Sequence, residues 1–170
     1  GGDFAAFLER FAPAASLPYL ADVARLEWAV SRALHAPDAA ALTVASLGSV
    51  DAANYAQICF APPPSLGLIH TIFPADVIWR AVLGDDDAAL TAIDLSSGPV
   101  WLLVQREPSG VHITRLEEAH WRFVSALCAG CPLGAALSEH AGIDATAVLA
   151  DLFKHERFAG FSLALRSDPP

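Results

Sequence analysis

The chain has 170 residues, 54% of them hydrophobic and 17% charged, with a formal net charge of −9. This apolar content excludes intrinsic disorder, because a core can offset the entropy lost on folding. The acidic balance argues against a protein whose main task is to bind the phosphate backbone of nucleic acids. No stretch approaches the roughly 20 apolar residues of a membrane span. Three cysteines are too few for a disulfide scaffold, so we expect a cytoplasmic protein without a membrane segment.

Residues 1–38 are predicted to form a helical segment. Apolar side chains recur at steps of three and four over residues 20–34, which predicts an amphipathic helix that ends before Pro37. Asp22 falls outside this apolar stripe.

A shorter apolar patch precedes that helix and is rich in phenylalanine: Phe4, Phe7 and Phe11. Together with the stripe it is larger than a lone helix should expose. We expect it to pack on residues 39–170 or on a second copy of the chain, as a homodimer.

The middle of the chain carries shorter patterns. Residues 50–56 predict a short helix, residues 57–60 and 66–72 predict strands, and residues 74–83 predict a helix. The acidic run at residues 84–87 is expected to be a solvated loop, because it lacks the spaced oxygen ligands of a calcium loop.

A β-hairpin is the clearest local signal. Residues 100–106 are β-branched and aromatic, residues 108–110 form a turn cluster, and residues 111–116 alternate between apolar and polar. Three predicted helices follow it, opening at Glu117, Pro132 and Asp144, and residues 158–165 predict a last strand. We therefore expect an α+β chain in which residues 39–170 form one mixed domain. The hairpin and the three helices are expected to form its winged-helix-like end.

Residues 137–148 have the spacing of a helix-turn-helix, with Gly142 at the turn and Asp144 as the cap of the second helix. A DNA-reading helix carries Arg, Lys, Asn or Gln near its start, whereas this one begins with Asp144 and Thr146. The spacing favours a winged-helix shape and the residue types disfavour contact with DNA. A DNA-binding transcription regulator is kept as the alternative function.

No motif in the sequence predicts catalysis. Cys128 and Cys131 form a CxxC motif at the end of a helix, where the helix dipole has the wrong sign to lower a thiol pKa. The motif has no second half for a zinc site, and the six histidines do not cluster. No nucleophile elbow or phosphate loop occurs. We therefore expect that the protein is not an enzyme and that it binds neither a cofactor nor a metal ion.

Several segments over nearly the whole chain carry a resemblance: residues 17–29 and 35–39, Phe73-Pro74 with Ile78-Trp79-Arg80, Val104-x-Arg106 with Val111, and residues 127–133. In this order they resemble the HvfC/BufC-like family, whose members are often labelled DNA-binding proteins. Family members carry a longer N-terminal helical domain, of which residues 1–38 would be the end. The resemblance implies a non-catalytic partner of a multinuclear non-haem iron oxidase that modifies cysteines in ribosomally made peptides. Such a partner holds the precursor peptide.

A hairpin followed by three helices also resembles the winged-helix module that binds leader peptides. In such a module an extended peptide adds a strand to a sheet edge beside a helix. The expected groove lies between residues 111–116 and 144–155, and its candidate lining is Val111, Ile113, Val148, Leu149 and Leu152. Proline at His112 is expected to remove an edge donor and weaken peptide capture, with little loss of thermal stability.

Overall fold

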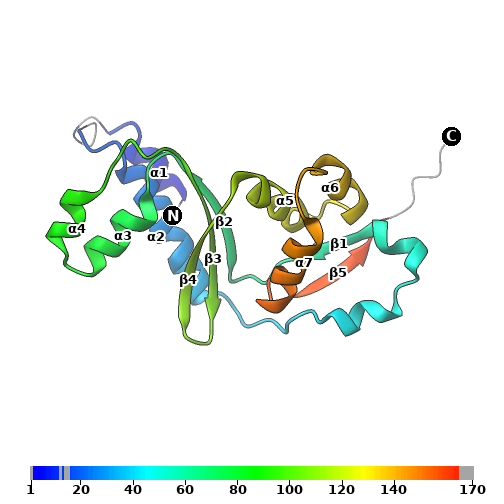
Figure 1. Cartoon of the computed structure of the whole chain (residues 1–170). Helices are drawn as coiled ribbons and strands as arrows, with labels where there is room; N and C mark the ends of the chain where they lie inside the picture. Colours follow the sequence, from blue (N-terminus) through cyan, green and yellow to red (C-terminus); the bar gives the residue numbers. More distant parts are fainter. Residues whose placement is uncertain (1, 12, 14–15, 165–170) are drawn as a thin grey trace. The chain divides into compact units, whose positions relative to one another are not determined.

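The chain divides into two compact units, each built from two separate stretches (Figure 1). The structure is a computed structural model and describes residues 2–11, 13 and 16–164. Unit 1 comprises Gly1–Ala36 and Gly67–Leu116, and unit 2 comprises Pro37–Leu66 and Glu117–Pro170. Helices and antiparallel strands occur in both units, so the α+β class is confirmed.

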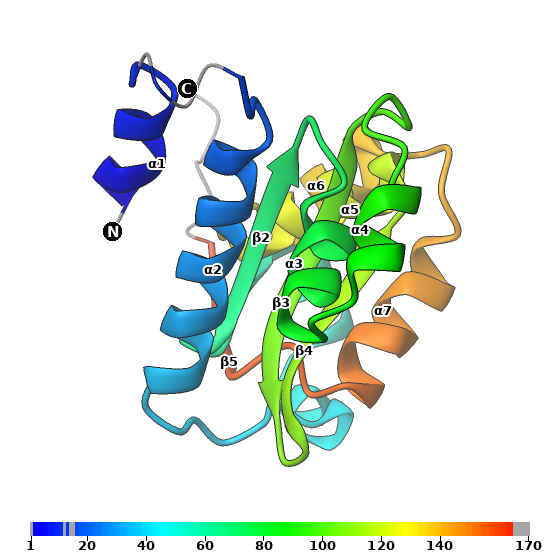
Figure 2. The same cartoon turned by 90° about the vertical axis from the view of Figure 1, so that its left-hand side faces the viewer.

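Unit 1 is a three-stranded sheet with helices. Its elements are α1 (Gly2–Leu8), α2 (Leu20–His35), β2 (Leu66–Thr71), α3 (Ala75–Leu83), α4 (Asp87–Ala92), β3 (Val100–Glu107) and β4 (Gly110–Leu116). The strand order is β2-β3-β4, which makes β4 an outer strand. Figure 2 shows α2 and α3 over one face of this sheet. The predicted hairpin and the strand at residues 66–72 are confirmed, whereas α4 replaces part of the expected acidic loop.

The core of unit 1 joins α2 and α3 to β3. Its buried members are Leu26, Ala33, Ala75, Val100, Leu102 and Val104. Val111 and Ile113 of β4 are partly buried and pack against this cluster. The residues at odd positions of β4 therefore face the helices, as expected from the alternation of side chains along a strand.

Asp22 does not lie on the solvent side of α2. Its side chain is buried, and its Oδ2 accepts hydrogen bonds from the backbone N–H groups of Ile72 and Phe73, at 2.8 and 3.0 Å. Its Oδ1 accepts from the guanidinium of Arg25. This carboxylate satisfies two backbone donors between β2 and α3, which explains an acidic residue inside the unit.

The phenylalanine patch packs on the chain less than expected. Phe4, Phe7 and Phe11 are 56%, 49% and 42% exposed and stack on one another, with ring centroids 6.3 and 5.0 Å apart. Their helix α1 packs on α2, where Arg25 pairs with Glu9. The expected burial against residues 39–170 is therefore wrong for these three rings. Coverage by a second copy stays a prediction.

Unit 2 combines a two-stranded sheet with short helices. Its elements are the 3₁₀ helices η2 (Val44–Ser49) and η3 (Ala52–Gln57), then β1 (Ile58–Ala61), α5 (Glu118–Cys128), α6 (Leu133–Glu139), α7 (Ala145–Lys154) and β5 (Gly160–Leu163). Strand β1 pairs with β5 in antiparallel register, from Ile58 opposite Leu163 to Ala61 opposite Gly160. Phe60 stacks on Phe158, and Phe153 meets both rings edge-on.

Gly134 marks a close approach in unit 2. A Cβ atom added there would lie 2.8 Å from the Cβ of Ala56, so only glycine lets α6 approach η3 this closely.

The expected winged-helix-like unit is not confirmed, because its parts fall in different units. The hairpin β3–β4 lies in unit 1, and the three helices that follow it lie in unit 2. The reason is that the buried side chains of β3, Leu102 and Val104, pack on α2, and α5 and α6 pack on β1 instead. The expected boundary near residue 38 lies close to the first of three crossings between the units, which falls after Ala36; the other two fall after Leu66 and Leu116.

None of the helices in the described part of the chain has the length and apolar character needed to cross a lipid bilayer.

Candidate functional site

The five expected groove residues do not share one unit. Val111 and Ile113 lie on β4 in unit 1, where they pack against the core. Val148, Leu149 and Leu152 lie on α7 in unit 2, and Leu152 is fully buried there. Neither unit alone contains the expected groove. Unit 1 contains the outer edge of β4, which is the strand edge of the expected groove.

The register of the hairpin decides which backbone groups β4 offers. Glu107 opposes Gly110 across a two-residue turn, so this pair exchanges both hydrogen bonds. Because such pairs alternate along an antiparallel ladder, the pair of Gln105 with His112 is also hydrogen-bonded. The N–H of His112 therefore serves the hairpin itself, and the expectation that it lies at the open edge is wrong.

The same alternation directs the backbone of Val111, Ile113 and Arg115 away from β3. Among the described residues, none of these three N–H groups has a hydrogen-bond acceptor. The carbonyl oxygen of Ile113 accepts a hydrogen bond from Nη2 of Arg80 on α3, at 3.2 Å. The outer edge of β4 thus presents unpaired donors, and one of its carbonyls is occupied by a side chain rather than by a strand.

Two arginines share one buried carboxylate beside this edge. Nε and Nη2 of Arg115 donate to the two carboxylate oxygens of Asp76, at 2.9 and 2.7 Å. Nη1 of Arg80 lies 3.6 Å from Oδ2 of the same residue. The Asp76 side chain is 1% exposed, whereas Arg80 and Arg115 are 54% and 46% exposed. Hydrogen bonding to Asp76 raises the pKa of Arg115 above its ordinary value, so this guanidinium is charged.

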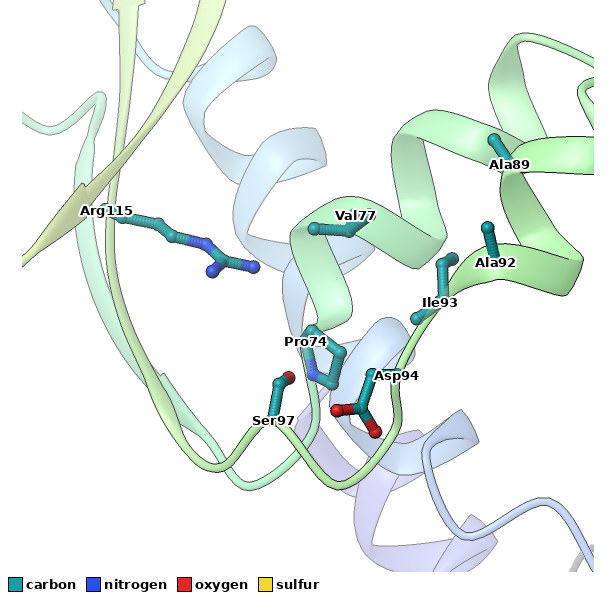
Figure 3. Close-up of a pocket in the computed structure, with 8 residues that line it drawn as sticks. All are labelled: Pro74, Val77, Ala89, Ala92, Ile93, Asp94, Ser97 and Arg115. Atoms are coloured by element: carbon teal, nitrogen blue, oxygen red, sulfur yellow. The ribbon is translucent and has the colours of Figure 1, made fainter.

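A pocket of about 380 Å³ adjoins this cluster (Figure 3). Most of its lining is apolar and comes from α3, α4 and their flanks: Pro74, Val77, Ala89, Ala92 and Ile93. Asp94, Ser97 and Arg115 supply the polar groups. Two hydrogen bonds from Ser96 lower the pKa of the Asp94 carboxylate: the larger effect comes from the side-chain hydroxyl and the smaller one from the backbone N–H. The pocket is thus mainly apolar, with an arginine from β4 in its wall.

Sequence reasoning reached only one part of this site. Arg80 belongs to the Ile78-Trp79-Arg80 segment of the family resemblance, but nothing in that segment indicates contact with β4. Asp76 stands in the first turn of α3, a common place for an exposed acidic residue, so its burial had no local signal.

Helices α6 and α7 of unit 2 have the expected helix-turn-helix order. The Asp144 side chain caps α7 by accepting from the N–H of Ala147, at 3.0 Å. Two of the basic residues of unit 2 are engaged by acidic ones, Arg122 by Glu118 and Arg157 by Asp151. The start of α7 offers no basic side chain.

The CxxC motif lies where it was expected, with Cys128 as the last residue of α5. Burial raises the pKa of the Cys128 thiol to about 11, so this thiol is protonated at neutral pH. Among the described residues, no three His, Cys, Asp or Glu side chains gather in a group that could hold a metal ion.

No family model matches the chain, and no curated protein and no solved structure matches it.

Proposed function

We propose that the chain is a non-catalytic peptide-binding protein that presents a ribosomally made precursor peptide to a separate iron-dependent modifying oxidase. The observation that carries the peptide-binding part is the outer edge of β4, with the outward backbone groups of Val111, Ile113 and Arg115. The oxidase and the precursor peptide are inferred from the family resemblance of segments such as residues 17–29.

Edge pairing suits this task physically. An open edge strand is a template for another strand, and proteins usually protect such edges with charged side chains. Arg80 is placed in this way, because it donates to the carbonyl of Ile113. Its side chain is half exposed and can turn away, so an incoming peptide strand can take its place. Backbone pairing then supplies affinity and the neighbouring side chains supply selectivity.

The test is selection of peptides followed by amide hydrogen exchange. A library of random nine-residue peptides displayed on phage is selected on the purified full chain. Synthetic copies of the enriched peptides are then added to the chain, and exchange is followed by NMR. We expect the amides of Val111, Ile113 and Arg115 to exchange quickly in the unbound chain and to become protected with peptide. His112 and Thr114 serve as the matched control, because their amides are bonded within the hairpin in both states.

Two results would contradict the peptide-binding proposal. One is a failure to enrich any peptide, and the other is binding that leaves the three outward amides unprotected.

The role beside an oxidase needs its own experiment. The oxidase and the short cysteine-bearing peptide encoded nearest to this chain are expressed with it, and the mass of the peptide is measured. We expect the peptide to be modified only when this chain is present. An equal mass change without the chain would contradict the presenting role.

DNA binding is the weaker alternative, and the order of α6 and α7 is the observation that favours it. The net charge of −9 and the acidic cap Asp144 at the start of α7 oppose it. Any binding to duplex DNA should fall by about tenfold or more between 50 and 200 mM salt. Sequence-selective, salt-tolerant nanomolar binding, measured by fluorescence anisotropy, would make regulation the better proposal.

A further inference from the structure

We propose that the pocket beside β4 selects the peptide: it receives one large apolar side chain of the paired strand, while a carboxylate two residues away in that peptide binds Arg80. This inference rests on the proposed function, since it requires a strand at the β4 edge. It names the class of segment that this edge would take. That segment is extended and carries a residue the size of leucine or phenylalanine and an aspartate or glutamate at the next position on the same face.

The direction of the side chains connects the edge to the pocket. Arg115 contributes its side chain to the pocket wall, and its backbone N–H and C=O point out of the sheet edge. Residues directly opposite each other on neighbouring strands project to the same face. A peptide residue paired with Arg115 therefore projects toward α3 and α4, which form the rest of the pocket (Figure 3).

The lining sets the chemistry of that residue. Val77 and Ile93 supply branched apolar surface, and Ala89 and Ala92 are small enough to leave the space open. The carboxylate of Asp94 already accepts bonds from Ser96, which lessens its demand for a partner in the ligand. A large apolar side chain fills such a space with favourable burial, whereas a charged one would lose hydration without gaining a partner there.

The charge beside Ile113 sets the second requirement. Two guanidinium groups, those of Arg80 and Arg115, face the single carboxylate of Asp76, and Asp76 makes its two short bonds with Arg115. A strand paired at Ile113 takes the carbonyl that Arg80 now binds, which leaves Arg80 in need of a new acceptor. Ile113 and Arg115 lie two positions apart on one face of β4. A peptide residue two positions from the apolar one therefore lies on the same face and pairs at Ile113, where its carboxylate reaches Arg80.

The experiment uses the same phage library and three variants of the full chain. Ala92→Trp fills the pocket from an exposed position of α4, and Thr91→Trp places the same ring on an exposed position of α4 that does not line the pocket, as the matched control. We expect the best peptide to bind the Ala92→Trp variant about tenfold more weakly or worse, and to bind the Thr91→Trp variant with unchanged affinity. Selection on Arg80→Gln should lose the enrichment of aspartate and glutamate but keep the apolar residue. Isothermal titration gives the affinities, and circular dichroism reports folding.

A second variant keeps the test decisive if Ala92→Trp does not fold. Val77→Ser removes apolar surface from an exposed position of α3 and should weaken the same peptide without filling the pocket.

The outcomes separate this inference from the function on which it rests. Peptides that protect the Ile113 amide, but show no apolar preference or bind the pocket variants unchanged, would overturn the pocket assignment and leave peptide binding intact. A library that yields no binding peptide would overturn both.

Discussion

Asp22 ties α2 to the chain between β2 and α3, through its bonds to the N–H groups of Ile72 and Phe73. We expect Asp22→Ala to lower the free energy of unfolding by about 1–3 kcal/mol, because two partly buried donors lose their acceptor. Urea unfolding followed by circular dichroism measures this loss. Glu27→Ala is the matched control, since Glu27 is an exposed acidic residue of the same helix. A loss no larger than that of the control would show that water replaces the carboxylate without cost.

Cys128 links stability to alkaline pH. Burial raises the pKa of its thiol to about 11 from an ordinary value of 9.0. The unfolded chain therefore releases this proton near pH 9, whereas the folded chain holds it until about pH 11. The contribution of the protonated thiol to the free energy of unfolding is complete below pH 9 and is lost as the pH rises to 11. The free energy of unfolding falls over this range by up to about 1.4 kcal/mol per pH unit.

Replacing the thiol should remove that slope. We expect the unfolding free energy of Cys128→Ala to fall less steeply than that of the parent chain between pH 9 and 11, as measured by urea unfolding at several pH values. Parallel curves for the two proteins would contradict the prediction.

Buried acidic residues mark the limit of sequence reasoning at this scale. Asp22 and Asp76 look like surface residues in their helices, because helical periodicity tells which face is apolar and not what lies opposite each position. The donors to these two carboxylates come from residues far along the chain, Ile72 for Asp22 and Arg115 for Asp76. Neither pairing leaves a trace in the local pattern.

At the scale of the element, the hairpin makes a prediction about His112. Because its N–H is bonded within the hairpin, we expect His112→Pro to destabilise unit 1 by about 1–3 kcal/mol, in contrast to a substitution at an open edge. The thermal midpoint, measured by calorimetry, should fall accordingly. His112→Thr keeps the backbone donor and suits a strand, so it should leave the midpoint nearly unchanged. Equal midpoints for the two variants would mean that the register is different.

Elements with local signals could be predicted, and their pairings could not. The β3–β4 hairpin was predictable because its branched residues, its turn and its alternation lie within residues 100–116. The pairing of β1 with β5 brings Ile58 opposite Leu163, far apart in the chain, and each strand is only four residues long. The packing of α2 on the hairpin also has no signal in the neighbouring sequence. The order of the elements therefore predicted a single winged-helix-like unit.

At the scale of the whole molecule, the exposed rings of α1 predict self-association. Exposed apolar patches of this kind commonly mark interaction surfaces, and Phe4, Phe7 and Phe11 form one continuous stack. We expect the mass measured by light scattering to rise with concentration toward twice that of one chain. Phe7→Ser should abolish the rise, because Phe7 is the central ring and touches both others. Since the rings are half exposed, the same change should cost the monomer little stability.

A constant monomer mass over the full concentration range would contradict self-association. Val44→Ser serves as the control for solubility, because it removes an exposed apolar side chain from unit 2.

The crossing of the chain between its two units also sets an order of events during synthesis. As the chain leaves the ribosome, β1 emerges before the sheet of unit 1 is complete, yet its partner β5 comes only at Gly160–Leu163. Once Leu116 has emerged, β2, β3 and β4 are all present and can assemble, while β1 still waits. The nascent chain thus passes through a stage in which the β2-β3-β4 sheet is complete and β1 has no partner strand yet. That strand, Ile-Cys-Phe-Ala, is apolar and prone to mispairing, so it is the segment we expect a chaperone to hold during translation.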